Sequence, residues 1–475
     1  MEFGLEILSY IFWLIVALMV LVFVHEMGHF LFAKLFRMRV DRFSIGFPPK
    51  IVGKKIGETE YMIGATPLGG YVKIAGMVDE SMDTDYAASE PQPWEFRSKP
   101  VWQRIIVITA GVVFNILLAI GIFAGLRWAY GEDYVPAENV EAVYVSEHSP
   151  AYEMGLRTGD RIVAVSGRKL ERFQDLDAIE NILADPFTIT VERSGQQLTF
   201  EGPPDIVTRL GRSEIGLGIS PIPSLIGGVM EGSAADSAGI RPGDRIIAIG
   251  GQPVRFWNEM TEKLQQSNGQ PLTVQWERPD SLMSTTLASN GPAVAIMSDT
   301  LGGIHILEAT VTPRWSDSDE KFVLGVGGPD PALLGAEFGV RHRDFNPIEA
   351  IHAGATETWQ YTSAIVTSLK RVFTGRDDFR ENMGGIVSIA KYTKEAADLG
   401  AATFWRMVAL LSISLAVMNI LPIPALDGGH LVFLIYEGIT RREPSLRVRM
   451  ALQQVGMIVL LVFMTFLIFN DILKL

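Results

Sequence analysis

Four long runs of apolar residues stand out along the chain. The first extends from Ile7 to Val24, and every residue in it is apolar except Ser9 and the amphipathic Tyr10. The other three runs are 105–126, 407–426 and 455–470. Because about 20 apolar residues in a helix cross the hydrocarbon core of a bilayer, the pattern predicts four transmembrane helices and the lipid bilayer as a partner.

Lysine and arginine gather on one side of these runs if the runs alternate in direction. They follow the first run (Lys34, Arg37, Arg39, Arg42), precede the second (Arg97, Lys99, Arg104) and separate the third from the fourth (Arg441, Arg442, Arg447, Arg449). The positive-inside rule makes that side cytoplasmic. Both chain termini and the long segment between the second and third runs are therefore expected on the outer side.

The outer segment contains an internal repeat. Residues 149–167 (SPAYEMGLRTGDRIVAVSG) match residues 233–251 (SAADSAGIRPGDRIIAIGG) at ten of nineteen positions without a gap. Each copy predicts a short helix, a Gly-Asp turn and a strand, and resembles the core of a PDZ domain. PDZ domains add a peptide as a strand beside a backbone loop, and Gly216-Leu217-Gly218-Ile219 is the predicted loop. The alternative is that the repeats are spacers or gates that bind no peptide.

A further helical pattern lies between the repeats and the third run, within residues 345–402. Apolar or small residues recur there at helical spacing, at Ile348, Ile351, Ala355, Trp359, Thr362, Ile365 and Leu369. This periodicity predicts an amphipathic helix. We expect its stripe to pack against the protein core in preference to lying on the outer membrane surface.

Composition narrows the function classes. Of the 475 residues, 48% are hydrophobic, and the formal net charge is −13. Binding to nucleic acid needs clustered Lys and Arg that neutralise phosphates, so we expect no nucleic-acid partner. The chain has no cysteine, which excludes a cysteine protease and a zinc site with Cys ligands.

The chain is too long for one compact core, and the runs and repeats divide it into five parts. The expected parts are an N-terminal membrane part (1–128), a first PDZ domain (129–220), a second PDZ domain (221–312), a linker with amphipathic helices (313–402) and a C-terminal membrane part (403–475).

The candidate chemistry begins in the first run, where residues 25–29, His-Glu-Met-Gly-His, form an HExxH motif. On a helix, positions four apart share a face, so both imidazoles can bind one Zn²⁺ while Glu26 lies beside the open coordination position. Two helical histidines satisfied by their neighbours are the alternative. Such groups are costly to bury in a spanning segment, which favours a functional site.

A catalytic zinc usually takes three protein ligands, so His25 and His29 need a partner at a similar membrane depth. With alternating runs, the two histidines and Asp427, which follows the third run directly, all lie toward the cytoplasmic side. His430, three residues after Asp427, competes for the same role.

The segment from Asn419 to His430 (NILPIPALDGGH), taken together with HEMGH, resembles the site-2 protease family of intramembrane metalloproteases. Four spans, tandem PDZ-like repeats between the second and third, and Thr109-Ala110-Gly111 leading to Asn115 are similar to the same family. In that family the carboxylate of the LDG motif completes the zinc site, which implies Asp427 as the third ligand. The resemblance covers essentially the whole chain.

The resemblance implies an intramembrane metalloprotease of the bacterial inner membrane with one catalytic Zn²⁺. Glu26 would take a proton from the zinc-bound water and return it to the leaving amine. The implied substrates are single-span membrane proteins already shortened on the outer side, in particular the anti-sigma-E factor, and leftover signal peptides. The PDZ repeats would then exclude substrates with bulky external domains.

Two elements are expected to bind the substrate. Asn419, expected one helical face away from Asp427 and preceding Pro422, is placed to hydrogen-bond the substrate backbone, unless its amide instead satisfies a carbonyl freed by the proline. Residues 59–74 predict strands of a hairpin that dips toward the membrane, with Gly69, Gly70 and Tyr71 as substrate-binding residues. Its edge could accept an unwound substrate by strand addition; an ordinary cytoplasmic hairpin is the alternative.

The expected fold is therefore a multi-span α-helical membrane protein with a membrane-associated β-hairpin and two external α/β PDZ domains in tandem. Two other functions stay open. One is a membrane-anchored PDZ scaffold with a structural zinc, and the other is a metalloprotease that acts on soluble cytoplasmic proteins.

Overall fold

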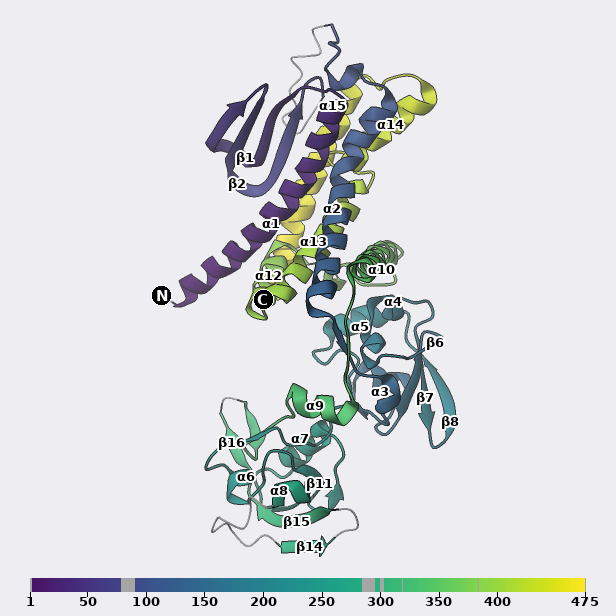
Figure 1. The fold of residues 1–475 in the computed structure, drawn as a ribbon. Coiled ribbons are helices and arrows are strands. Elements are labelled where there is room, and N and C mark those ends of the chain that lie inside the picture. Colours follow the sequence, from purple (N-terminus) through teal and green to yellow (C-terminus); the bar gives the residue numbers. More distant parts are fainter. Residues whose placement is uncertain are drawn as a thin grey trace. The chain divides into compact units, whose positions relative to one another are not determined.

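The computed structural model describes residues 2–77, 90–283, 295–299, 303–317, 319–382 and 384–474 (Figure 1). It divides into two compact units. The first unit is Met1–Glu132 together with Asp344–Leu475, and the second is Asp133–Arg343. The first unit carries the long apolar helices, and the second carries two small modules of strands and helices.

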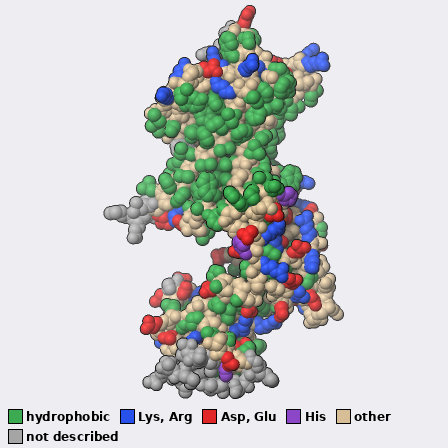
Figure 2. Space-filling view, in the orientation of Figure 1, with side chains coloured by type: hydrophobic (Ala, Val, Ile, Leu, Met, Phe, Trp, Pro, Cys, Tyr) green, Lys and Arg blue, Asp and Glu red, His purple; other side chains and the backbone are tan. Residues whose placement is uncertain are grey.

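Four helices in the described part of the first unit are long and apolar enough to cross a membrane. They are α1 (Glu2–Leu35), α2 (Val101–Tyr130), α13 (Ala401–Ile420) and α15 (Leu446–Lys474). Phe123 of α2 packs in one cluster with Ala409 of α13, and Leu21 of α1 packs with Val408. Figure 2 shows hydrophobic side chains gathered over this unit. The prediction of four helices of spanning length and composition is confirmed.

The third apolar run is not a single helix. α13 ends at Ile420, residues 421–426 form a turn, and α14 (Asp427–Thr440) begins at Asp427. Pro422 and Pro424 explain the break, because proline has no backbone N–H and restricts the residue before it. The expectation that Asn419 and Asp427 lie one helical face apart on the same helix is therefore wrong.

This turn lies tightly against the start of α14. A Cβ at Gly428 would collide with the carbonyl oxygen of Leu421. On the other side, a Cβ at Gly456 of α15 would collide with the carbonyl oxygen of Pro424. Ala425 has a φ of 80°, a region that residues with a Cβ rarely adopt. Contacts on two sides thus hold the turn, residues 421–426, that precedes Asp427 at the start of α14.

The strands β1 (Val40–Ile56) and β2 (Thr59–Ile74) pair with each other twice. Ser44 lies opposite both Met62 and Tyr71, and Lys54 lies opposite Tyr61. The chain therefore forms four antiparallel segments, in the order 50–56, 59–63, 42–45 and 70–74, rather than a single hairpin. The edge segment 70–74 lies against α1, since a Cβ at Gly70 would be 2.6 Å from Cγ1 of Val22.

The amphipathic region forms α10 (Pro347–Phe373), α11 (Phe379–Asn382) and α12 (Ile386–Asp398). Small residues make the close contact of α10 with α2: a Cβ at Gly354 would lie 2.7 Å from the backbone nitrogen of Ala124. Ile348, Ile351 and Trp359 are instead 81%, 58% and 72% exposed. The expected core packing is therefore wrong for these three residues, because a close helix approach favours small side chains.

The second unit contains two larger antiparallel sheets, one of four and one of five strands, each with short helices. The first module has the strand order β6-β5-β7-β8, and the second has β12-β11-β13-β15-β14. The first comprises α3 (Pro150–Met154), β5 (Arg161–Val165), β6 (Arg168–Lys169), α4 (Ile179–Ile182), β7 (Thr188–Arg193), β8 (Gln196–Glu201) and α5 (Ile206–Arg212). The second comprises α6 (Ala234–Ser237), β11 (Arg245–Ile249), β12 (Gln252–Pro253), α7 (Trp257–Gln266), β13 (Leu272–Pro279), α8 (Asp280–Met283), β14 (Ala295–Asp299) and β15 (Ile304–Val311).

The Gly-Asp turns of the two matching stretches share one polar contact. Asp160 accepts hydrogen bonds from Nε and Nη2 of Arg193, and Asp244 accepts them from the same atoms of Arg278. Each arginine also donates to the carbonyl of the glycine near the end of the preceding short helix. The pair thus links the helix, the turn and a strand within each module.

Candidate metal centre

Helix α1 presents two histidines on one face. His25 and His29 are four residues apart, and their Nε2 atoms lie 3.2 Å from each other. The two residues are only 7% and 9% exposed. Two imidazoles that share a face inside an apolar helix are thereby directed at a common point.

The third atom at this point comes from α14. Oδ2 of Asp427 lies 3.2 Å from Nε2 of His25 and 3.4 Å from Nε2 of His29. In a tetrahedral zinc site with bonds of about 2.0–2.1 Å, neighbouring ligand atoms lie about 3.3 Å apart. The three measured separations fit that spacing. Among the described residues, this is the group of His, Asp and Glu side chains that could hold a metal ion.

Hydrogen bonds at Nδ1 orient the two histidine rings so that Nε2 can bind a metal. Nδ1 of His29 lies 2.8 Å from the carbonyl oxygen of Val107, and an Nδ1–H donated to that oxygen leaves the Nε2 lone pair directed at the centre. Nδ1 of His25 lies 3.3 Å from the amide of Asn115. The oxygen of this amide is buried without a hydrogen-bond partner in the described residues. An Asn115 amide turned by 180° would accept the Nδ1–H of His25 in the same way.

The donor set also tests whether zinc fits. Oδ2 of Asp427 is buried and has no hydrogen-bond donor among the described residues. It faces two imidazole nitrogens that carry lone pairs when each ring donates through Nδ1. Three lone pairs that converge without a proton between them are unfavourable alone and favourable around a cation. The residues therefore fit Zn²⁺.

Two glycines let α2 approach the centre closely. A Cβ at Gly28 of α1 would lie 2.5 Å from the carbonyl oxygen of Ala110. A Cβ at Gly111 of α2 would lie 2.5 Å from Nε2 of His29 and 2.6 Å from Cε1 of His25. Any side chain at position 111 would therefore enter the space in which the imidazoles meet.

A pocket of about 100 Å³ opens beside the three ligand atoms. Glu26, Tyr71 and Asn419 line it, together with His25, His29 and Asp427. Glu26 is partly buried, and a Cβ at Gly70 would lie 3.3 Å from its Cγ. The pocket has room for water molecules, so a carboxylate and an open space adjoin the metal ligands.

The remaining predicted residues lie at different distances from this centre. Nδ2 of Asn419 is 3.3 Å from Nε2 of His25, although Asn419 belongs to α13 and not to the helix of Asp427. His430 lines the pocket but is not one of the three ligand atoms. A Cβ at Gly69 would lie 2.5 Å from Cε2 of Phe47, so this glycine packs against that ring. Pro422 is exposed at the turn.

Sequence reasoning assigned no role to Gly111 and Asn115, which contact the histidines. Asn115 is fully buried in a run that has no charged residue. An amide in the middle of a spanning segment is costly to bury unless it has a partner. Its presence in this run could therefore have indicated a contact at the functional site. No sequence signal could identify the carbonyl of Val107 as a partner of His29, because every residue has a backbone carbonyl.

The predicted PDZ loop packs in the first module of the second unit. β9 (Ile219–Ser220) pairs with β4 (Tyr144–Val145), and the backbone N–H of Ala151 donates to the carbonyl of Leu217. The second module has a matching segment that the sequence did not reveal: the N–H of Ala235 donates to the carbonyl of Leu324. β18 (Val326–Gly327) there pairs with β10 (Gly228–Val229).

Comparison with known proteins agrees with this geometry. A model of peptidase family M50 matches residues 13–463. The regulator of sigma-E protease RseP of Escherichia coli (strain K12) is 33% identical over 485 residues, covering 97% of this chain and 98% of the relative. The protein of that name from Salmonella typhimurium is 31% identical over 477 residues, with the same coverage. A Vibrio cholerae relative, named as a zinc metalloprotease, is 30% identical over 482 residues, again covering 97% and 98%.

These matches extend over nearly the entire chain, so they include both the histidine helix and the segment that carries Asp427. The chain therefore belongs to peptidase family M50 and is a zinc metalloprotease of the site-2 protease type.

Proposed function

We propose that this protease hydrolyses peptide bonds within the transmembrane segments of single-span membrane proteins. The observation that carries the proposal is the depth of the ligand group along α2. Gly111, which adjoins both imidazoles, is ten residues or about 15 Å from the start of the helix and nineteen residues or about 29 Å from its end. A site on the membrane surface would lie near a helix end instead.

Glu26 would act as the general base and acid. Zinc, when bound, lowers the pKa of the water it coordinates and polarises the substrate carbonyl. Glu26, on the pocket wall, would accept a proton from the attacking water and return it to the leaving amine. Asn419, whose amide is 3.3 Å from Nε2 of His25, donates to the substrate backbone beside the bond that is cut.

The substrate must be extended before its carbonyls are available, because a helix occupies them in its own hydrogen bonds. Segment 70–74 is the edge of its sheet and supplies Tyr71, Val72 and Ile74 to the pocket wall. An unwound substrate would add to this edge as a further strand. Gly70 suits the role, since it brings the strand backbone up to Glu26, while Gly69 and Tyr71 pack on Phe47 behind it.

The orientation is proposed from the arginine and lysine clusters. Clusters of arginine and lysine follow α1, precede and begin α2, and follow α14, which favours a cytoplasmic position for those ends. Both termini and the second unit would then lie in the periplasm. The metal centre, whose histidines lie six and ten residues before the end of α1, would lie within the bilayer in its cytoplasmic half.

Two relatives carry the name regulator of sigma-E protease, which supports membrane-bound anti-sigma factors as substrates. Leftover signal peptides are short apolar helices of the same chemical class. The two modules of the second unit would act as PDZ domains that exclude substrates with bulky external parts. Gly216, Leu217, Gly218 and Ile219 would form the peptide-binding loop of the first module.

A second candidate function is a PDZ scaffold with a structural zinc. A structural zinc is usually closed by four protein ligands, and His430 would have to supply the fourth. The open pocket beside Glu26 favours catalysis instead.

The two functions are separated by Glu26→Gln in the full-length protein, reconstituted with a single-span substrate. We expect zinc content equal to wild type and a loss of cleavage of at least about a hundredfold, because the general base is gone. Metal analysis and gel analysis of the products measure these quantities. Undiminished cleavage would refute the role of Glu26, and cleavage by neither protein would favour the scaffold.

The filter hypothesis is tested by removing residues 133–343, the whole second unit. A shorter deletion would leave Leu324 and Phe338, which belong to the cores of the modules, without their partners. We expect the shortened enzyme to cut substrates with intact external domains, which the full-length enzyme leaves uncut. Unchanged selectivity would sink this part of the proposal.

A further inference from the structure

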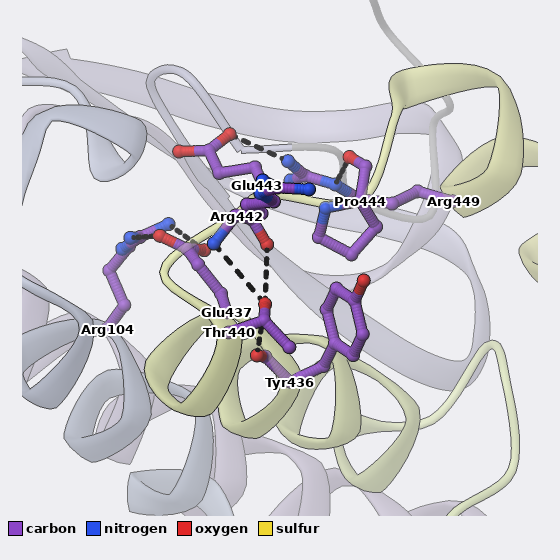
Figure 3. A network of polar contacts seen from close by, with 8 residues as sticks. All are labelled: Arg104, Tyr436, Glu437, Thr440, Arg442, Glu443, Pro444 and Arg449. Atoms are coloured by element: carbon purple, nitrogen blue, oxygen red, sulfur yellow. Dashed lines mark hydrogen bonds and ion pairs between the residues drawn. The ribbon is translucent and has the colours of Figure 1, made fainter.

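A buried ion pair joins the far end of α14 to α2 (Figure 3). Arg104, in the first turn of α2, donates from Nη1 to Oε2 of Glu437 at 3.1 Å and from Nη2 to Oε1. The two side chains are 5% and 11% exposed. A bidentate contact between arginine and carboxylate fixes direction as well as distance.

The helix dipoles do not account for this pair. Arg104 is a cation at a helix N-terminus, and Glu437 is an anion in the last turn of α14, so each charge lies at the end that disfavours it. Burial adds a desolvation cost to both. Each charge is therefore stabilised by its partner rather than by its helix, which points to a role other than local helix stability.

The pair lies on the same helix faces as the metal centre. On α14, Asp427, Leu434 and Glu437 are seven and three residues apart and share one face. Leu434, between the two carboxylates, is buried in one cluster with Ile108 of α2. The facing stripe of α2 begins at Arg104 and reaches Gly111, whose Cβ would touch the imidazoles. Ten residues, or about 15 Å, separate the ion pair from the ligand.

The apolar contact at Leu434 is non-directional and does not by itself fix the rotation of α14 about its axis. A rotation of 20° moves an atom about 5 Å from the axis by about 1.7 Å, whereas metal ligands need distances within about 0.2 Å. We propose that Arg104 and Glu437 are positioning residues that set the rotation of α14 and so hold Asp427 toward the two imidazoles. The inference rests on the proposed role of Asp427 as a zinc ligand.

The end of α14 is held firmly enough for this role. Arg441 ends the helix with a left-handed φ of 57°, and Oγ1 of Thr440 donates to the carbonyl of Tyr436 at 2.8 Å (Figure 3). Beyond the turn, Nε of Arg449 donates to the carbonyl of Pro444 at 3.1 Å. Glu437 therefore projects from a capped helix end and not from a frayed one.

The test is the double variant Arg104→Met/Glu437→Leu in the full-length protein. An apolar pair of similar size commonly keeps or raises stability when it replaces a buried ion pair, but it removes the directional contact. We expect thermal stability at least equal to wild type, zinc affinity lowered roughly 10–100-fold, and altered visible absorption bands of the Co²⁺-loaded protein. Competition with a chromophoric chelator measures the affinity.

Matched variants separate the possible outcomes. Glu443→Gln, in an exposed pair with Arg449, should bind zinc like wild type, and the swap Arg104→Glu/Glu437→Arg should regain most of the affinity. The positioning role is refuted if the double variant binds zinc like wild type while Asp427→Asn binds it more weakly. It is also refuted if the zinc affinity of the double variant falls only because its thermal stability falls as well. Wild-type zinc affinity in Asp427→Asn would instead refute the ligand assignment itself.

Discussion

Each of the two units buries a carboxylate, Asp244 in the second and Asp427 in the first, and the surroundings of these two carboxylates are opposite. In the second unit, Asp244 and Arg278 are almost completely inaccessible, and both oxygens of the carboxylate accept from the guanidinium, at 2.8 and 2.7 Å. In the first unit, Oδ2 of Asp427 is also buried but faces imidazole nitrogens and has no hydrogen-bond donor among the described residues.

This difference separates a structural charge from a functional one better than burial does. A buried ion pair that is fully hydrogen-bonded costs most when one partner is removed, because the other charge is left uncompensated. A cluster of lone pairs without protons is incomplete until a cation binds it. The comparison predicts that substitutions in the second unit change folding, whereas substitutions around Asp427 change metal binding.

The largest effect is expected from Arg278→Met, which leaves Asp244 buried without its partner. Breaking a fully buried pair costs about 3–5 kcal/mol, so strands β11 and β13 should lose protection in hydrogen exchange measured on the full-length protein. Arg193→Met is the matched control in the first module. The side chain of Arg193 is 34% exposed, although that of Asp160 is only 1% exposed. Water can therefore replace the arginine beside the carboxylate, and the loss should be clearly smaller. Equal losses in the two modules would contradict the comparison.

An intermediate effect is expected from Gly111→Ala in the first unit. The added methyl would lie 2.5 Å from Nε2 of His29, so one imidazole has to move and zinc affinity should fall roughly 10–100-fold. Gly121→Ala on the same helix is the control, because nothing lies within 4 Å of a Cβ there. Zinc titration of both variants checks the prediction, and equal affinities would show that α2 does not shape the site.

How much of this the sequence could reveal depends on the range of each interaction. The spacing of His25 and His29 is a local pattern that correctly placed both on one helix face. The apolar runs are local too and predicted four helices of spanning length, although the third run ends as a helix at Ile420. Asp427 was predicted as the third ligand from the family resemblance and from its membrane depth, but the sequence analysis did not predict that it begins a new helix. That position depends on how Pro422 and Pro424 break the run, and proline signals were present there.

Contacts between distant segments could not be predicted in the same way. The partners Arg104 and Glu437 are 333 residues apart, and nothing in either local pattern indicates the other. The stripe of α10 was misjudged for a related reason: periodicity shows that a helix has an apolar face but not which face meets α2. Gly354, a residue without a side chain, makes a close contact there.

The smallest effect sharpens the comparison most. Asp427→Asn in metal-free protein removes a buried charge that has no donor among the described residues, so, unlike Arg278→Met, it should not destabilise the fold. In excess chelator we expect an unfolding temperature equal to or slightly above that of wild type. The free energy of unfolding should rise by no more than about 1 kcal/mol, because burying a neutral amide costs less than burying a carboxylate. With zinc present, the wild-type protein alone should gain stability from binding. Tryptophan fluorescence during heating, with and without zinc, measures both the stability of the metal-free protein and the gain in stability from zinc. A clear loss of stability without metal would mean that Asp427 supports the fold as Asp244 does, and the distinction between the two units would fail.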